Sequence, residues 1–481
     1  MKLTRMFEAS RRFLFFDYFR IPYREAGESP SDTPRGYASI RRIASGTQRA
    51  LYWPADLNAA GLLPPASYRL DSIPFHAATV PDRTAQAVLA SIGAAWRPTD
   101  PIFDGRGQRV SSVWRDDRGS TFLPFDPDEA IRNYWSEGYG NQGRGQGRLI
   151  GAARSSYYRL RPLIPRSPQI WFRRRWSKVQ ARSQFPRWPV EPGLHDLYNF
   201  LLRAVAQVAA EPVPWVAWWP AGHSWAMVLT HDVEHEEGLR NVSRLRDLER
   251  SVGHRSSWNF VPRRYEVGDA LITELVGEGC EVGVHGLHHD GRDFASRSIF
   301  EERLPEIRSY AKRWGAVGFR APSMHRVWDW MPRLGFDYDS SYPDTDPFEP
   351  QPGGCCSLLP FFIDDLVELP LTLPQDHTLY VILSASDERV WVEKTDEIRR
   401  RNGMAMLNVH PDYIFTGGTL EAFRRYLEMF GEDEEAWHAL PREVSAWWRR
   451  RAQSSIRRDG NGWELVGPAA AEGSIAFASP E

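Results

Sequence analysis

The chain of 481 residues contains only three cysteines, Cys280, Cys355 and Cys356. Adjacent cysteines do not readily bridge each other, and no CxxC spacing is present, which excludes a disulfide framework and a cysteine-based zinc site. Such cysteine usage fits a reducing compartment. The sequence also lacks any run of about 18 apolar residues, which excludes a membrane-spanning helix. We therefore predict a cytoplasmic protein.

An export signal is also not apparent. The opening stretch, MKLTRMFEASRRFLFFDYFRIPYR, has basic residues and a short apolar run, but Asp17 interrupts that run. No small-residue cleavage site follows it, so we predict no signal peptide.

Acidic residues are missing from 138–190, where arginine and lysine recur among aromatic residues, as in WFRRRWSKVQARSQFPR. Basic-aromatic stretches suit anionic membrane surfaces or nucleic-acid phosphates, and peripheral membrane contact through the arm 141–190 is one interpretation. The alternative is an arm packed on acidic patches of its own chain, such as 431–437. No nucleic-acid-binding module accompanies it, so no nucleic acid partner is expected.

The pattern of the chain divides it into four parts. Residues 1–140 are rich in turns and their fold is unassigned. Residues 141–221 combine the arm with an amphipathic helix over 194–210. Residues 222–450 alternate short apolar strands with helices, and 451–481 form a tail.

Strands that alternate with helices predict parallel pairing, with the helices outside the sheet. About seven strands in the third part suit a barrel or a barrel-like closure. The fold class is therefore α/β, with an N-terminal extension of mixed structure. In such folds the carboxyl ends of the strands carry the chemistry.

Titratable side chains follow at least five of these predicted strands. THDVEH follows WAMVL, HGLHHD follows CEVGV, RAP follows AVGF, DSSY follows FDY, and HPDY follows MAMLNV. One carboxylate and two imidazoles form a divalent metal site of the kind that hydrolases use. Zn²⁺ is the first expectation, and Co²⁺ or Ni²⁺ suit the same ligands. A second carboxylate can take a proton from water, and a separate imidazole can protonate a leaving group.

The order of these motifs resembles the polysaccharide deacetylases, the NodB-homology group of carbohydrate esterase family 4. The family's Thr-Phe-Asp-Asp is matched by THDV with a following Glu, its His-Ser/Thr-x-x-His by HGLHH, its Arg-x-Pro by RAP, and its Leu-x-x-His by LNVH. DSSY is a weaker match to a fourth motif. The resemblance covers about 222–430. It implies a distorted (β/α) barrel and metal-dependent hydrolysis of N- or O-acetyl groups on glycans.

The resemblance also implies roles for individual residues. His285 and His289 resemble metal ligands, Asp232 the general base, Arg320 the residue that orients the base, and His410 the general acid. The chain departs from the family at Val233, where a second Asp is usual.

Glu234 is the nearest acid to this departure. Residues i and i+2 of a strand share a face, so Glu234 is assigned to the metal and Asp232 to the base. The reverse assignment stays open, as does a site in which Asp232 alone binds metal.

Three further residues are weaker candidates. Asp339 is expected to orient His410. Tyr342 and Trp328 are candidates for the wall of a sugar groove, with core packing as the alternative. His231 and His288, beside the motif residues, are expected to point elsewhere.

The sequence thus predicts a metal-dependent deacetylase that hydrolyses N-acetyl or O-acetyl groups on a glycan or a lipid-linked sugar precursor. In a cytoplasmic protein the substrate would be such a precursor and not a mature cell wall. Two alternatives stay open: a glycan-binding or scaffold module that has lost catalysis, and a hydrolase of a small cyclic amide or ureide. The substitution at Val233 keeps the first of these in consideration.

Overall fold

The computed structural model describes residues 6–27, 33–43, 49–56, 61–143, 166–181, 183–460 and 462–480. The chain divides into two compact units. Unit 1 comprises 1–142, 192–222 and 450–481, and unit 2 comprises 143–191 and 223–449. The predicted tail 451–481 therefore belongs to unit 1, and the predicted segment 141–221 is divided between the units. Residues 144–165 of the arm lie outside the described residues.

Unit 1 is built on one large mixed sheet. The sequence had left the fold of residues 1–140 unassigned. In the described residues the strand order of this sheet is β2-β1-β3-β4-β9-β8-β7-β5-β6. Helices α1 (Leu14–Phe19), α2 (Asp82–Ile92), α3 (Pro127–Trp135) and α6 (Gly193–Ala209) belong to this unit. The strands are β1 (Phe7–Ala9), β2 (Tyr23–Glu25), β3 (Tyr37–Arg42), β4 (Ala50–Pro54), β5 (Leu63–Leu70), β6 (Ile73–Thr79), β7 (Trp96–Phe103), β8 (Arg109–Asp116) and β9 (Thr121–Phe122).

Alternation along β4 shows how both faces of this sheet are covered. Tyr52 packs in one cluster with Leu89 of α2. Its neighbour Trp53 stacks on Phe13, with ring centroids 4.7 Å apart, just before α1. Successive strand side chains point to opposite faces, so α2 covers one face of the sheet and the α1 segment the other. Two short ladders complete the unit: β10 (Val213–Val216) with β22 (Ile475–Ala478), and β20 (Ser455–Asp459) with β21 (Gly462–Val466).

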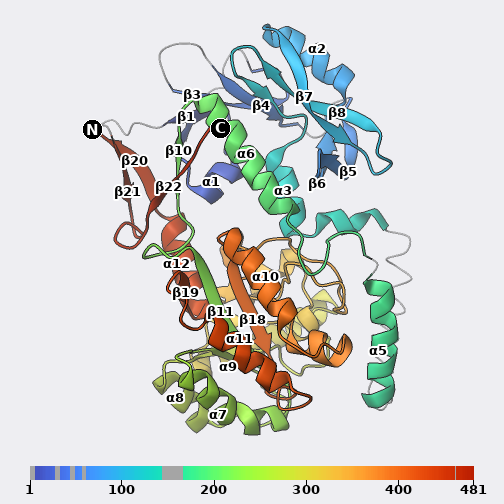
Figure 1. Cartoon of the computed structure of the whole chain (residues 1–481), viewed down its shortest axis with the longest axis vertical. Helices are drawn as coiled ribbons and strands as arrows, with labels where there is room; N and C mark the ends of the chain where they lie inside the picture. The colour runs from blue at the N-terminus through green and yellow to red at the C-terminus, as the bar shows by residue number, and fades with distance from the viewer. Residues whose placement is uncertain are drawn as a thin grey trace. The chain divides into compact units, whose positions relative to one another are not determined.

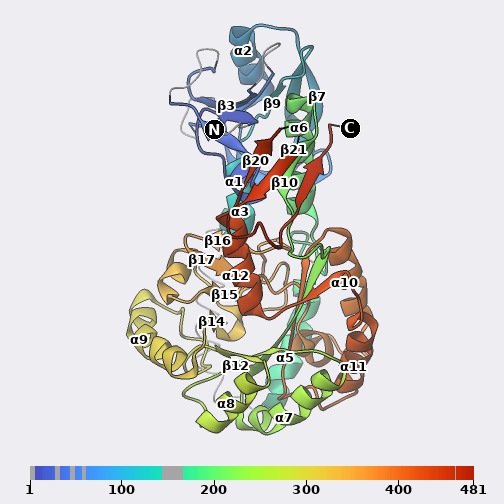
Figure 2. The same cartoon turned by 90° about the vertical axis from the view of Figure 1, so that its left-hand side faces the viewer.

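Unit 2 is a mixed α/β unit with a curled, half-barrel sheet (Figures 1 and 2). Its described strand order is β16-β17-β15-β14-β13-β12-β11-β18, with β19 also on β11. All pairs are parallel except β16 with β17. The strands are β11 (Trp225–Val233), β12 (Ser257–Phe260), β13 (Glu281–Val284), β14 (Gly318–Phe319), β15 (Tyr338–Asp339), β16 (Phe361–Ile363), β17 (Leu366–Glu368), β18 (Met404–Val409) and β19 (Ala436–His438).

The central strands of this sheet are buried along their whole length. Every residue of β11 and β18 is buried, which is the pattern of parallel strands covered on both faces. The helices around them are amphipathic, with buried residues such as Trp391 and Ile398 at helical spacing. They are α7 (Glu236–Ser251), α8 (Asp269–Gly277), α9 (Arg297–Trp314), α10 (Arg389–Arg400), α11 (Thr419–Phe430) and α12 (Pro441–Ala452).

Pro305 lies inside helix α9, and a 3-10 helix, η4 (Trp328–Leu334), lies in the connection from β14 to β15. In the described residues no pairing joins β18 to β16, so hydrogen bonds do not close the predicted barrel. No helix of the described chain is long and apolar enough to cross a membrane.

Glu281, the first residue of β13, makes the stability of unit 2 depend on pH. Its carboxylate accepts from the Tyr338 hydroxyl (2.8 Å) and the Arg442 backbone N–H (2.9 Å). Burial raises its pKa from 4.5 to about 7, against these hydrogen bonds. Between those two pH values the folded state binds more protons than the unfolded state, so stability falls as pH rises through this window.

We expect Glu281→Gln to remove this dependence. The amide can donate to Tyr338 and accept from Arg442, so the contacts are kept while the charge is lost. The fall in unfolding free energy between pH 4.5 and 8 should shrink by about 1–3 kcal/mol relative to wild type. Denaturant titrations at both pH values measure it, with exposed Glu302→Gln as the control. An unchanged pH dependence would contradict the assignment.

Candidate active site

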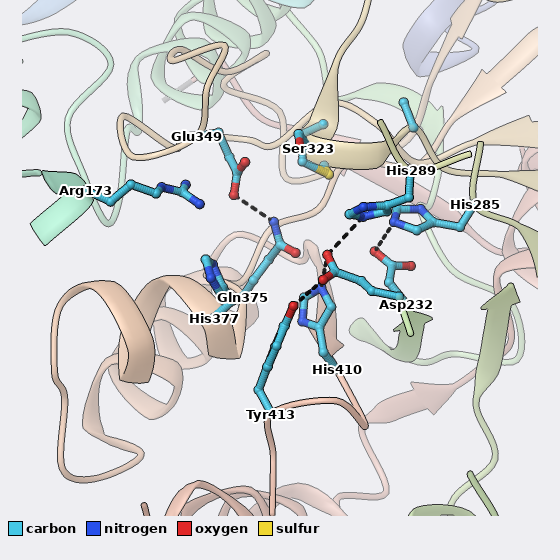
Figure 3. Close-up of a pocket in the computed structure, with 13 residues that line it drawn as sticks. Arg173, Asp232, His285, His289, Ser323, Glu349, Gln375, His377, His410 and Tyr413 are labelled. Carbon is cyan, nitrogen blue, oxygen red and sulfur yellow. Dashed lines mark hydrogen bonds and ion pairs between the residues drawn. The ribbon is translucent and has the colours of Figure 1, made fainter. Parts of the chain in front are cut away.

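The polar residues predicted at the strand ends of unit 2 meet at one edge of its sheet. β11 pairs in parallel with β12 and β18, and β12 with β13. Parallel strands place their carboxyl ends together, so the segments after β11, β13 and β18 converge. Asp232, Glu234, His285, His289 and His410 line the same pocket (Figure 3). The structure therefore brings together five of the six principal residues that the sequence predicted.

Glu234, His285 and His289 form a group that can hold a metal ion. Each offers one ligand atom, and these atoms lie within 4.8 Å of one another. The departure at Val233 does not remove the carboxylate from this group, because Glu234 reaches it from just beyond the end of β11. The Val233 backbone carbonyl accepts from the Tyr265 hydroxyl, which holds the chain at this point.

The two histidines present their Nε2 atoms to this group. His285 Nδ1 lies 3.1 Å from the Arg320 carbonyl oxygen and donates to it, so the lone pair of Nε2 faces the pocket. Arg264 donates to Nδ1 of His289 (2.8 Å). His289 Nε2 is buried without a hydrogen-bond partner, and it lies 3.0 Å from Glu234 Oε1. Because Nδ1 accepts from Arg264, the ring proton of His289 is carried on Nε2. A buried nitrogen without a hydrogen-bond partner is suited to bind a metal ion, which would displace that proton.

Glu234 is held as an anion. Burial opposes its ionisation, but His289, His410 and the Tyr413 hydroxyl, which donates to Oε2, keep its pKa well below the usual value. The Glu234 backbone N–H donates to Asp412 (2.9 Å), which fixes the loop after β11. This carboxylate is therefore charged and placed for a cation.

Asp232 is more tightly enclosed than Glu234. Oδ1 accepts from Asn259 (2.9 Å) and Arg320 (3.3 Å), and Oδ2 accepts from Asn408 (2.9 Å). Burial opposes ionisation here also, but His285, Arg320 and His410 hold the pKa of Asp232 below its usual range. Oδ2 lies 3.9 Å from His285 Nε2, beside the metal group.

Arg320 lies behind Asp232 and not in the pocket itself. Its side chain is fully buried and also donates to Thr230 (2.8 Å) and to Ser340 (3.0 Å). The guanidinium fixes one oxygen of Asp232, the residue that the sequence predicted as the base.

His410 is paired with Asp376, not with the predicted Asp339. His410 Nδ1 donates to Asp376 Oδ1 (2.6 Å), and its backbone N–H donates to Oδ2 (2.9 Å). Burial lowers the pKa of His410, but the charge and hydrogen bond of Asp376, aided by Glu234 and Asp232, raise it to about 10. His410 is thus a cation near neutral pH, and its Nε2 is 3.9 Å from Glu234 Oε1.

Asp339 was the wrong orienting residue because of the strand order. It ends β15, which four other strands separate from β18 in the sheet, and both its oxygens accept from Ser341. Asp376 arrives instead from the segment after β17, immediately before the π-helix η5 (His377–Ile382). The polar triplet Gln375-Asp376-His377 after an apolar run was the signal in the sequence that could have identified it.

Tyr342 and Trp328 do not line the pocket. Tyr342 is buried and packs edge-on against Trp328, with ring centroids 6.2 Å apart, and Phe361 packs on both. These ring contacts fit core packing, the alternative prediction for both residues, and not the wall of a sugar groove. His231 is buried against Glu249 (2.7 Å), on the far side of β11 from Asp232, and His288 is exposed.

Other pocket residues were missed because they come from loops and from outside the sheet. Glu349 accepts from Gln375 (3.1 Å) across the pocket from the metal group. Arg173 comes from α5 (Arg166–Gln180), the helix of the basic arm, and points toward Glu349 (Figure 3). The pocket lining in full is Arg173, Asp232, Glu234, His285, His289, Ala321, Ser323, Met324, Glu349, Gln375, His377, His410 and Tyr413.

No family model matches the chain, and no curated protein matches it. About half of the chain resembles solved polysaccharide deacetylases. One, from Mycobacterium smegmatis and described as a polysaccharide deacetylase, is 20% identical, with 51% of this chain and 96% of that chain covered and a TM-score of 0.41.

Two further solved structures resemble the chain in the same way. The PuuE allantoinase is 16% identical, with 48% and 92% of the two chains covered and a TM-score of 0.40. A family 4 carbohydrate esterase from Streptomyces lividans, solved with acetate, is 12% identical, with 44% and 91% covered and a TM-score of 0.29. These likenesses include the family that the motifs resemble.

Proposed function

We propose that unit 2 is a metal-dependent hydrolase that removes acetyl groups from an N-acetylated or O-acetylated sugar. The observation that carries this proposal is the pocket itself. Three atoms that can bind a metal, a buried carboxylate and an imidazole paired with Asp376 converge there from the ends of β11, β13 and β18. A structural role would not need these groups to share one pocket, whereas hydrolysis of an amide needs each of them.

Glu234, His285 and His289 would hold the metal, and Zn²⁺, Co²⁺ or Ni²⁺ suit two nitrogen ligands and one oxygen ligand. When bound, such an ion polarises the acetyl carbonyl and lowers the pKa of a water molecule. Three protein ligands leave positions for water and substrate, as in other catalytic sites.

The remaining residues move the protons. Asp232 accepts the proton of the attacking water, whose oxygen bonds to the acetyl carbon. His410 then gives its Nε2 proton to the amide nitrogen as the C–N bond breaks, which releases acetate and a free amino sugar. Asp376 keeps His410 protonated and fixes its ring, and Arg320 fixes Asp232. Each acid–base step is worth about 10²–10⁴ in rate.

The opposite wall of the pocket suits a polar substrate. Arg173, Glu349, Gln375 and His377 present donors and acceptors there, and apolar side chains are few. This lining supports a sugar with several hydroxyl groups. We place the reaction in the cytoplasm, on a glycan precursor that is free or lipid-linked.

The proposal is tested by metal analysis of the purified protein together with acetate release from a panel of N-acetyl sugars and glycans. We expect about one tightly bound divalent ion per chain and release of acetate from at least one member of the panel. Metal without acetate release would favour the binding module or a hydrolase of cyclic ureides, for which allantoin is the probe. Absence of metal binding would overturn both enzyme proposals.

Asp376→Asn tests the pairing with His410. Loss of the negative charge removes the main cause of the raised His410 pKa, so the alkaline limb of the kcat profile should move to lower pH. We expect kcat to fall about 10–100-fold, with KM and metal content little changed. Asp387→Asn, near the start of α10, is the matched control. An unmoved alkaline limb would show that Asp376 is only structural.

A further inference from the structure

Helix α5 of unit 2 has a face on which large apolar side chains and cations are exposed together. Its sequence, RSPQIWFRRRWSKVQ, has five cations and no acidic residue. The described part of the chain has seven exposed large apolar side chains, and three of them belong to this helix. Trp171 is 54% exposed, Trp176 60% and Val179 51%. Such a concentration on one short helix is unusual for a surface that faces only water.

The other side of α5 is attached to unit 2. Ser177 is buried, and Arg174 Nε donates to the Val381 carbonyl oxygen just within η5 (2.9 Å). Arg173 reaches the pocket, where it lies 3.4 Å from the Phe348 carbonyl oxygen. Figure 1 shows α5 flanking unit 2. The helix is therefore held by one side, which fixes the direction of the other.

Cations are interleaved with the exposed apolar residues. Arg175 lies over the Trp171 ring, with its guanidinium carbon 5.4 Å from the ring centroid. Arg175 and Lys178 are both exposed. Indole rings have an apolar body and a polar N–H, which suits the boundary between headgroups and acyl chains, and the cations suit anionic headgroups.

We propose that α5 docks on an anionic lipid surface with Trp171, Trp176, Val179, Arg175 and Lys178 toward the bilayer. Charge complementarity selects this partner, because no acidic side chain of the helix opposes it. A nucleic acid would be met by the cations but leaves Val179 and the exposed indoles without an apolar environment. The helix has 15 residues, too few to span a bilayer, so it lies on the surface.

Docking would also determine where the pocket lies relative to the bilayer. Arg173 lines the pocket from the attached side of the docked helix, so docking would hold the pocket close to the bilayer, with α5 between them. This step rests on the proposed function: the sugar to be deacetylated would then be attached to a lipid. Attachment of the helix to the membrane does not itself depend on the reaction.

The test is sedimentation of the full chain with vesicles of phosphatidylcholine alone or with 30% phosphatidylglycerol. We expect binding to the anionic vesicles, weakened by raising NaCl from 0.1 to 0.5 M. Arg175→Gln with Lys178→Gln should weaken that binding by about tenfold or more. Trp176→Ser with Val179→Ser should weaken it several-fold. The control removes two exposed cations elsewhere in unit 2, Arg240→Gln with Lys312→Gln, and should bind like wild type.

Several outcomes would overturn the docking proposal. They are no preference for anionic vesicles, unchanged binding by the α5 variants, equal loss in the control, or tighter binding to an oligonucleotide than to the vesicles. Acetate release from a soluble N-acetyl sugar tests the proposed function separately from membrane docking. Arg175→Gln with Lys178→Gln should leave it unchanged, and its absence in wild type would count against the proposed function alone.

Discussion

Replacing His285 by Ala is expected to remove the bound divalent metal and, with it, all acetate release above background. Its Nε2 is one of three ligand atoms within 4.8 Å of one another, and two remaining ligands hold a divalent ion weakly. His289→Ala should act in the same way. Elemental analysis after dialysis against a weak chelator measures the metal, and titration of the apo-protein measures its affinity.

The matched control for these variants is His288→Ala, which removes an exposed imidazole from the same loop. It should retain both metal and turnover. Metal content as high as wild type in His285→Ala would show that the metal, if present, is held elsewhere. Circular dichroism of each variant distinguishes loss of the ligand from loss of the fold.

The second large effect is expected at His410. His410→Ala should retain the metal but lower kcat for an N-acetyl sugar by about 10²–10⁴, because the departing amine then lacks a proton donor. An aryl acetate such as 4-nitrophenyl acetate has a leaving group that needs no proton. The kcat for the aryl acetate should therefore fall much less than the kcat for the N-acetyl sugar. The ratio of these two losses measures how far His410 acts as the general acid.

Equal losses on both substrates would contradict the assignment of His410 as the acid. His377→Ala is the comparison for this experiment, because His377 also lines the pocket and its backbone N–H, which donates to Asp376 (2.7 Å), is kept in the variant. Its main effect should be on KM. A loss of metal in His410→Ala would instead place this residue among the ligands.

The strands and helices of unit 2 could be predicted from the sequence because each depends on a local pattern of residues. Buried strands such as β11 and β18 are short apolar runs, and helices such as α10 repeat apolar residues at helical spacing. The closure of the sheet could not be predicted, because it depends on pairing between its two ends. The sheet that the described residues of unit 1 form was also missed. Many of its strands pair with a neighbour in sequence, but its halves are joined by β4 with β9, where Leu51 pairs with Thr121, and no local pattern predicts that pairing.

The site was predictable to the extent that its residues end strands. Asp232, His285 and His410 were identified because parallel strands bring their carboxyl ends together. Asp376, which pairs with His410, and Arg173, which lines the pocket, were not identified, because each belongs to a segment whose path only packing decides. Asp339 was predicted wrongly for the same reason, since a residue at a strand end can lie several strands from its expected partner.

The sequence alone determined which kinds of group this protein has and in what order: two imidazoles four residues apart, an acid two residues after another, and a histidine at the end of the last predicted strand. Tertiary structure alone decided which of them meet. It places Glu234 with the two histidines, surrounds Asp232 with donors, and pairs His410 with Asp376. The reason is physical: ligand geometry and a raised or lowered pKa arise from neighbours in space, and most of these neighbours are distant in sequence.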